Sequence, residues 1–304
     1  MFPGSKGPGF YFLLLIRYMA KWRKFRGARL PRTNYNRFIS QGTSKEELEI
    51  ANFLQLELPR YKVYRGDRVV LQGKEIDIYV PSLKFGIEFH GNFFHKEKDP
   101  DYHLNKAILA EKAGVYLIQI FEDEWLHKRA LVIDLIRKAI GKYVMIEASC
   151  CECRKLSQKE AGQFFTKTHL LGAPDNLNNC LGLFYKNDLI YVCAFQTDGQ
   201  NITILRDSMM PGIFVHNGLL KVLQETWNEK GLKPVYLELD RRLFDGHEYK
   251  ELGFKEYACT PPNIYYSADF EERIPKARMT EAMLNNGEEW FTYYDAGNKK
   301  LILK

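Results

Sequence analysis

The chain has 304 residues, of which 45% are hydrophobic and 27% charged, and this composition is typical of folded globular protein rather than disordered or fibrous sequence. Its longest apolar run, Phe10–Ile16, is much shorter than the ~20 residues of a membrane-spanning helix. Basic residues follow this run where a signal peptide would have a small-residue cleavage site. We therefore expect a cytoplasmic protein of about two domains, without a membrane partner.

The net charge of +6 is concentrated at the N-terminus. Residues 1–40 contain nine basic residues and no Asp or Glu, whereas the rest of the chain has a small acidic excess. Such an arm suits the phosphate backbone of nucleic acid, because each neutralised phosphate releases counterions. A solvated tail or contact with an anionic membrane surface are the alternatives. The arm residues expected to bind DNA are Lys21, Arg23, Lys24, Arg26, Arg29, Arg32 and Arg37.

Six cysteines are too few for a disulfide-rich secreted scaffold. Three of them cluster at Cys150, Cys151 and Cys153, which is one half of a possible zinc site. No second Cys or His pair follows at zinc-finger spacing. We therefore expect reduced, partly buried thiols here.

The first half of the chain alternates helix and strand signals. Ser44 and Glu47 form a capping box that begins a helix, and Pro59 ends it. Alternating apolar positions predict strands at 61–64, 69–72, 75–80, 84–90 and 115–121, and wider spacing predicts helices at 102–114 and 123–140. This order predicts a compact α/β unit.

The second half repeats neither these segments nor their order. Helices are expected at 156–169, 218–230 and 247–252, and strands at 182–184, 189–195, 202–206 and 235–239. A glycine at 253 would cap the short third helix. These signals predict a second α/β unit.

Two neighbouring strand segments of the first unit carry acidic side chains. Asp77 alternates with isoleucines, and the same period of two places Glu88 and His90 on one face of the next strand. Carboxylate oxygens are the ligands that Mg²⁺ prefers, and a bound metal activates water for phosphodiester hydrolysis. The alternative is that both carboxylates lie on a solvated edge or pair with a basic residue such as Lys106.

Five ordered motifs cover almost all of residues 44–141: Ser44-x-x-Glu47-x-Glu49-Ile50, Gly73–Pro81, Ile87–His95, Tyr102-His103-x-x-Lys106 and Phe121–Trp125. Together they resemble the phage homing endonucleases whose fold is similar to the very-short-patch-repair (Vsr) endonuclease, a branch of the PD-(D/E)XK nucleases. The resemblance implies a metal-dependent enzyme that hydrolyses DNA at a specific site, with Mg²⁺ or Mn²⁺ as cofactor. It also implies the cytoplasm of the host cell if the chain is encoded by a phage.

The same resemblance implies a set of site residues. Asp77 and Glu88 would bind the metal, and His90 would act as general base or acid, because its pKa lies near neutrality. The family commonly has Trp in place of Phe94 and often Asn in place of His90. The acidic run Glu122–Glu124 is explained by the preference of helix N-termini for negative charge. The full catalytic set is Glu47, Asp77, Glu88, His90, His95, His103 and Lys106.

Residues 146–301 carry a looser set of motifs: Leu181-Gly182-Leu183, Leu239–Arg242, Gly246-x-x-Tyr249-x-x-Leu252-Gly253-Phe254, Pro261–Tyr266 and Tyr294–Asn298. They resemble a GNAT-type acyltransferase fold similar to phage Mom-like DNA-modification proteins. The resemblance implies a glycine-rich turn for acyl-CoA, but Val215–Gly218 has one glycine where relatives usually have two. No cofactor-binding residue is assigned, and exposed Arg241 and Arg242 are expected to contact DNA.

The sequence therefore predicts an α/β (α+β) chain: a basic arm (1–42), a Vsr-like restriction-endonuclease-type core (43–142) and a GNAT-like α/β domain (146–304). The leading hypothesis is a Mg²⁺-dependent DNA endonuclease acting on double-stranded DNA. A DNA-modifying GNAT-type acyltransferase and a non-catalytic DNA-binding protein are the alternatives. The target sequence and the oligomeric state are not encoded in any motif.

Overall fold

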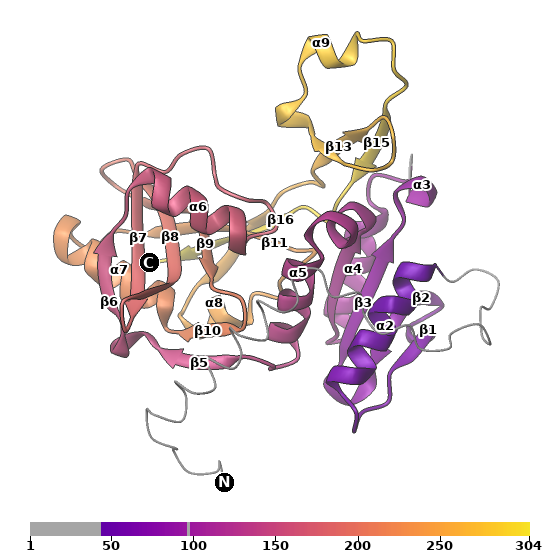
Figure 1. Cartoon of the computed structure of the whole chain (residues 1–304), viewed down its shortest axis with the longest axis horizontal. Helices are drawn as coiled ribbons and strands as arrows, with labels where there is room; N and C mark the ends of the chain where they lie inside the picture. Colours follow the sequence, from indigo (N-terminus) through magenta and orange to yellow (C-terminus); the bar gives the residue numbers. More distant parts are fainter. Residues whose placement is uncertain (1–43, 96–97) are drawn as a thin grey trace.

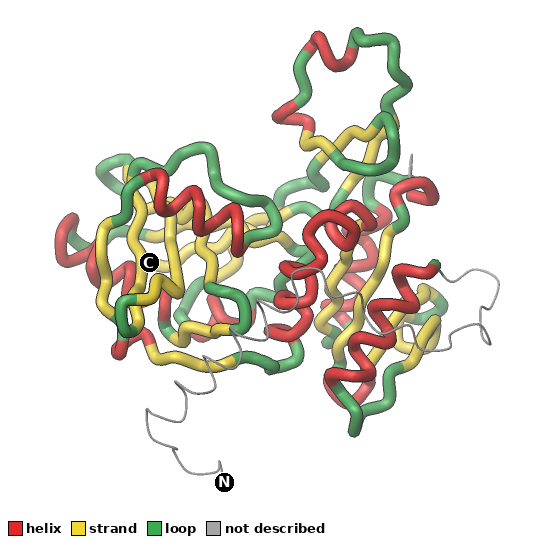
Figure 2. The backbone as a smooth tube through the Cα atoms, viewed as in Figure 1, coloured by secondary structure: helices red, strands yellow, loops and turns green. Residues whose placement is uncertain are grey.

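The computed structural model describes residues 44–95 and 98–304, with the side chains of 94 and 95 left out, and it has mixed α/β architecture. Two main sheets lie side by side, with helix α5 (Glu122–Ala139) between them in Figure 1. Figure 2 shows helices on the outside of both sheets. In the described part of the chain, no helix combines the length and apolarity needed to cross a membrane. The predicted basic arm, including its seven DNA-binding residues, lies outside the described residues.

The first sheet has four strands in the order β1-β2-β3-β4, and only the last pair is parallel. Its helices are α2, capped by the Ser44 hydroxyl as predicted, then α3, α4 and α5. The strands are β1 (Tyr64–Leu71), β2 (Lys74–Val80), β3 (Phe85–His90) and β4 (Tyr116–Phe121), and the helices are α2 (Lys45–Glu57), α3 (Asn92–His95) and α4 (Tyr102–Lys112), with the 3-10 turn η1 (Pro81–Leu83).

Alternation along β3 divides the two faces of this sheet. Ile87 and Phe89 join the core under α2 and α5, while Glu88 pairs with Lys106 of α4 on the other face. The two short strands predicted at 61–64 and 69–72 are one strand, β1. Gly66, which the sequence placed in a turn, has φ +65° inside that strand, and the register with β2 shifts between Asp67 and Leu71. An irregular strand therefore replaces the expected turn.

The second sheet has seven strands in the order β12-β16-β11-β9-β8-β7-β6. Its neighbours are antiparallel except β11 and β9. The strands are β6 (Glu152–Lys155), β7 (Asn179–Tyr185), β8 (Asp188–Thr197), β9 (Ile202–Met209), β11 (Val235–Asp240), β12 (Lys255–Cys259) and β16 (Asn298–Leu303). Helix α6 (Gln158–Thr168) packs through Phe164 and Phe165 on one face. Helices α7 (Gly218–Lys230) and α8 (His247–Glu251) pack on the main core of the other face.

Two smaller sheets complete the chain. Strand β10 (Ile213–His216) pairs in parallel with β5 (Val144–Glu147), which is followed by the 3-10 turn η2 (Ala148–Cys150). The other small sheet, β14-β13-β15, projects from the body at the top of Figure 1. It comprises β13 (Ile264–Ser267), β14 (Ile274–Pro275) and β15 (Phe291–Tyr294), with η3 (Lys276–Arg278) and α9 (Glu281–Leu284) between them. The two main sheets fall on either side of residues 142–146, and the division into domains stays a prediction.

Candidate functional site

The acidic residues singled out in the first unit lie together at the middle of its sheet. Asp77 of β2 accepts a hydrogen bond from the Phe89 N–H at 2.8 Å, and its carboxyl group interacts electrostatically with that of Glu88. Burial raises the pKa of Asp77 and raises that of Glu88 well above its usual range. Burial, followed by the neighbouring Asp77, raises the pKa of Glu47 on α2 to about 7. These carboxyl groups therefore hold protons more readily than free ones.

Lys106 of α4 forms a buried ion pair with Glu88. The Lys106 side chain is 6% exposed and the Glu88 side chain 5%. Each charged group therefore depends on the other for compensation of its charge. This is the internal pairing that the sequence left open as the alternative to a metal site.

The predicted histidines form a separate layer beside this pair. His90 Nε2 lies 3.1 Å from Gln119 Oε1, and the Gln119 side-chain amide donates to the His103 carbonyl at 3.0 Å. The rings of His90 and His103 are packed with their centroids 4.1 Å apart. His95 ends α3, and its side chain lies outside the described part of the structure. The structure thus brings together Glu47, Asp77, Glu88 and Lys106, and His90 with His103; a catalytic role for them stays a prediction.

The second sheet is incompletely paired at its centre. The parallel strands β9 and β11 pair at Val235–Ile202, Tyr236–Thr203 and Leu237–Ile204, although β9 continues to Met209 and β11 to Asp240. Over their remaining, fully described lengths the two strands do not pair with each other. Main-chain N–H and C=O groups on the facing sides of both strands therefore have no ladder there. We call these unpaired stretches, 205–209 of β9 and 238–240 of β11, the opening between the two strands.

A carboxylate and two phenols meet at this opening. Asp207, in the unpaired half of β9, accepts hydrogen bonds from the hydroxyl groups of Tyr191 at 2.9 Å and Tyr249 at 3.1 Å. Tyr191 is completely buried, whereas Asp207 and Tyr249 keep part of their surface exposed. Burial raises the pKa of Asp207, and burial with the adjacent Asp207 raises that of Tyr249 well above its usual range. Tyr249 is part of a motif in the sequence of the second unit, whereas no motif includes Asp207.

Helix α7 begins next to the same opening. Asn217 precedes it in the left-handed region at φ 58°, and its side chain makes no capping hydrogen bond. A Cβ at Gly218 would lie 3.2 Å from the ring of Tyr191, so a larger residue here would need this ring or the helix to shift by a few tenths of an ångström. The predicted glycine-rich turn is otherwise different, because Val215 and His216 belong to strand β10.

The expectation that Arg241 and Arg242 are exposed is wrong. Arg242 is 2% exposed and donates to Glu124 Oε2 at 2.6 Å and to the Gln119 carbonyl at 3.0 Å, both from the first unit. Arg241 lies 3.3 Å from a Glu111 carboxylate oxygen. Both guanidinium groups are therefore committed to contacts within the fold.

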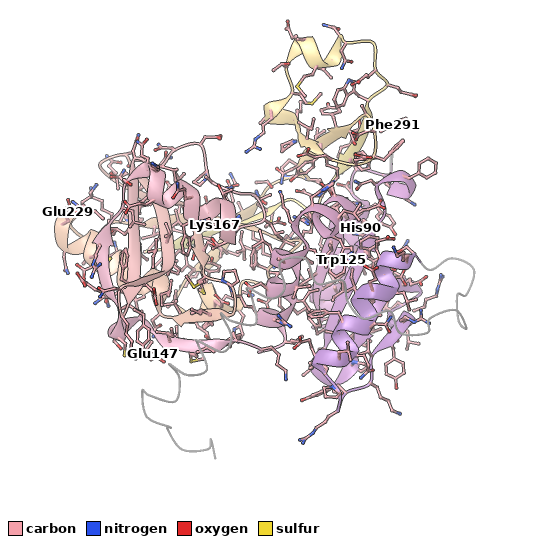
Figure 3. All side chains as sticks on the ribbon, viewed as in Figure 1. His90, Trp125, Glu147, Lys167, Glu229 and Phe291 are labelled. Carbon is pink, nitrogen blue, oxygen red and sulfur yellow. The ribbon has the colours of Figure 1, made fainter. Side chains whose placement is uncertain are left out.

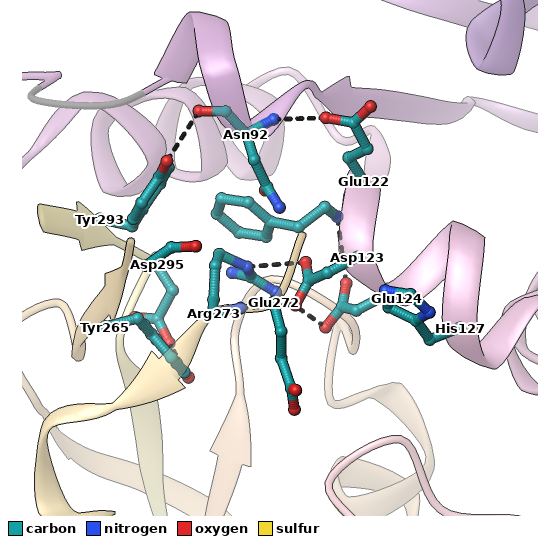
Figure 4. Close-up of polar contacts among 12 residues, drawn as sticks. Asn92, Glu122, Asp123, Glu124, His127, Tyr265, Glu272, Arg273, Tyr293 and Asp295 are labelled. Carbon is teal, nitrogen blue, oxygen red and sulfur yellow. Dashed lines mark hydrogen bonds and ion pairs between the residues drawn. The ribbon is translucent and has the colours of Figure 1, made fainter. Parts of the chain in front are cut away.

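Other polar contacts join the projecting sheet to the first unit (Figure 4). Arg273 Nε donates to Asp123 Oδ1 at 2.8 Å, and the Tyr293 hydroxyl donates to the Asn92 carbonyl at 2.9 Å. The acidic run before α5, expected to cap that helix, partly does so, since Glu124 accepts from the Phe121 N–H at 3.0 Å. The same run also receives the arginines of the second unit.

No protein-family model matches the chain, and no curated protein matches it. Similar solved structures include the ribosomal-protein-S18-alanine N-acetyltransferase from Escherichia coli (14% identity, TM-score 0.33), covering 50% of this chain and 92% of that one. An acetyltransferase from Bacillus subtilis in complex with CoA gives 15% identity and a TM-score of 0.32, covering 51% and 98%. Arabidopsis thaliana Naa50 in complex with a bisubstrate analogue gives 11% identity and 0.33, covering 51% and 99%. At these values the likeness concerns the fold of about half the chain.

The predicted Mg²⁺- or Mn²⁺-dependent DNA endonuclease is wrong on these findings, and with it the assignment to the hydrolases. The similar structures named above include acetyltransferases, which are transferases rather than hydrolases. In residues 44–95 and 98–304, no three or more His, Cys, Asp or Glu side chains are grouped so that they could hold a metal ion. Of the two predicted ligands, Glu88 has the Lys106 ammonium as its cation.

Proposed function

We propose that the chain is a GNAT-type acyltransferase that takes its acyl group from acyl-CoA and modifies a DNA-borne acceptor. The observation that carries this proposal is the opening between β9 and β11, with the Asp207 carboxylate and the Tyr249 hydroxyl at its edge. The order of the seven strands, which places this parallel pair near the centre of an otherwise antiparallel sheet, supports a binding site there.

The residues at the opening fit acyl-CoA. Unpaired main-chain groups on two facing strands can bond an extended ligand that carries amides, in the way that a peptide adds to a sheet edge. The start of α7 lacks a side-chain cap at Asn217, so its first N–H groups are suited to the oxygens of a diphosphate. Bound acyl-CoA would supply an activated thioester to the site.

Acyl transfer needs one group that takes a proton from the attacking nucleophile and another that gives a proton to the leaving thiolate. Asp207 suits the first role, because a raised pKa makes its carboxylate a better base near neutrality. Tyr249 suits the second, because its raised pKa keeps the phenol protonated. Their 3.1 Å hydrogen bond lets a proton pass between them.

DNA is proposed as the bearer of the acceptor because of the basic arm at residues 1–40, whose nine positive charges have no acidic neighbours in sequence. A cytoplasmic location, where both acyl-CoA and DNA are present, remains part of the proposal. The arm alone does not define an acceptor group on the DNA.

The test measures CoA release by the full chain with acetyl-CoA and duplex DNA, followed by mass spectrometry of the digested nucleosides. We expect an acetylated nucleoside, and a loss of about 100-fold in rate for Tyr249→Phe and for Asp207→Asn. Tyr257→Phe, an exposed phenol on β12, is the matched control and should be active. Failure of the wild-type chain to bind acetyl-CoA in calorimetry, with no CoA released, would refute the proposal.

A further inference from the structure

Two elements that are distant in sequence, α5 and β9, converge on the turn after α6. Lys128 of α5 donates to the Leu170 carbonyl at 2.7 Å, and Arg206 of β9 donates to the Gly172 carbonyl at 2.6 Å. His169 Nδ1 accepts from the Leu171 N–H at 3.1 Å within the turn itself. We call Lys128, Lys138, His169 and Arg206 the basic cluster.

Burial and the surrounding cations together keep the His169 imidazole neutral. Burial, together with the neighbouring Arg206, Lys128 and Lys138, lowers the pKa of His169 to about 3. Arg278 of the projecting sheet adds a further positive charge near Arg206. Acidic neighbours offset part of this charge: Asp134 pairs with Lys138 at 2.8 Å, Glu248 also lies near Lys138, and Asp175 lies near Arg206. An excess of positive charge therefore remains.

The cations of the basic cluster keep donors for an external partner. An ammonium has three N–H donors and a guanidinium five, so the carbonyls of Leu170 and Gly172 use only part of them. Lys128 is exposed to solvent, and so is Lys167, which Figure 3 labels at the end of α6. Phosphate oxygens are strong acceptors that can complete these donor sets.

The basic cluster also adjoins the opening between β9 and β11. Arg206 directly precedes Asp207, so alternation along β9 directs the two side chains to opposite faces of the sheet. Phosphates seated on the basic cluster would therefore contact β9 on the face opposite to the Asp207 carboxylate. They would also touch α5, and so span both units.

We infer that the basic cluster seats the phosphodiester backbone of duplex DNA. This inference rests on the proposed function, because the bound DNA would be the substrate of the proposed acyl transfer. We expect recognition by charge. Lys128 and Arg206 are held in place by hydrogen bonds to backbone carbonyls and can contact phosphates, and phosphate contacts carry no sequence information.

The experiment measures the dissociation constant of the full chain for a short fluorescent duplex over a range of salt concentrations, without acyl-CoA. Each phosphate contact contributes a slope of about 0.9 in log Kd against log salt. Lys128→Gln and Arg206→Gln should each reduce the slope by about that amount, and Lys128→Arg should restore it. The control is Lys155→Gln, an exposed lysine paired with Glu229 at the far edge of the second sheet, which should bind as the wild type does.

Circular dichroism melting identifies any variant that fails to fold, and Lys128→Gln is the decisive one because its side chain is exposed. An unchanged salt slope for a folded Lys128→Gln and a folded Arg206→Gln overturns the inference, even if the basic arm binds DNA. The proposed transferase activity fails separately, through absence of CoA release. Reduced slopes without CoA release would keep the DNA seat and reject the enzyme.

Discussion

Arg242 and Glu124 form the central ion pair between the two main sheets, with Nη1 2.6 Å from Oε2. Arg242 lies in the turn after β11, which ends at Asp240, and Glu124 lies in the first turn of α5, so the pair joins residues 118 positions apart. Burial alone would raise the pKa of Glu124, but Arg242 and Arg273 outweigh it and the pKa is lowered. The carboxylate is therefore charged, and the contact depends on its arginines.

Replacement of Arg242 by Met should destabilise the chain by about 3–5 kcal/mol, because it leaves Glu124 buried without its main partner. Urea unfolding at pH 7 measures the change. Arg154→Gln, which removes one half of an exposed pair with Glu152, should leave the free energy of unfolding almost unchanged, because solvent screens such pairs. The double variant Arg242→Met/Glu124→Gln should be more stable than Arg242→Met; the reverse order would contradict the role of the pair.

The sequence predicted those parts of the fold that local signals specify. The Ser44 cap, the alternation around Glu88 and the periodic segment of α7 each involve residues within one turn or one strand. The Arg242–Glu124 contact has no such signal, because a buried arginine and an exposed one look alike in a loop. The sheet at 264–294 was missed for another reason: its strands have two to four residues, too few for a period to be recognised.

The candidate site divides in the same way. Asp77 and Glu88 could be placed together from the period of two and a short connection. That Lys106 neutralises Glu88 depends on how α4 crosses the sheet, which spacing does not determine. Asp207 was missed because it stands in an ordinary strand segment, and only the separation of β9 from β11 gives it a special position.

Glu47→Gln tests the environment of the first acidic group. The pKa of Glu47 is about 7 in the folded chain against 4.5 for an ordinary glutamate, so its favourable contribution is complete below pH 4.5 and is lost as the pH rises through 7. At pH 8 the variant should be more stable than wild type by about 1 kcal/mol, after allowance for solvent screening at this half-exposed side chain.

Urea unfolding of wild type and Glu47→Gln at pH 4.5 and pH 8 gives the comparison. The two chains should agree at the lower pH and diverge at the higher one. Glu46→Gln removes a charge one residue earlier in the same helical turn and serves as control. A Glu47→Gln variant that is less stable than wild type at pH 8 would show that the fold favours the ionised Glu47 carboxylate, and would contradict this account.

Lys106→Met should destabilise the chain more at high pH than at low pH. Burial already raises the pKa of Glu88, and removal of the adjacent ammonium raises it further, so the variant must either bury an uncompensated charge or bind a proton. We expect a loss of about 3–5 kcal/mol at pH 8 and a smaller loss at pH 5. Lys106→Met/Glu88→Gln should recover most of the stability at pH 8, and equal losses at both pH values would contradict this account.

Two glycines in helices should respond to alanine in opposite directions. A Cβ at Gly218 would lie 3.2 Å from the ring of Tyr191, which is completely buried and bound through its hydroxyl to Asp207, so the ring cannot yield without breaking that contact. Gly218→Ala should therefore cost about 1–3 kcal/mol. At Gly162 in α6 a Cβ would meet Leu177 at an ordinary 3.4 Å, so Gly162→Ala should stabilise by up to ~1 kcal/mol through helix propensity. Thermal melting of both variants decides: a Gly218→Ala chain as stable as wild type would mean that α7 packs less tightly on β8 than these contacts require.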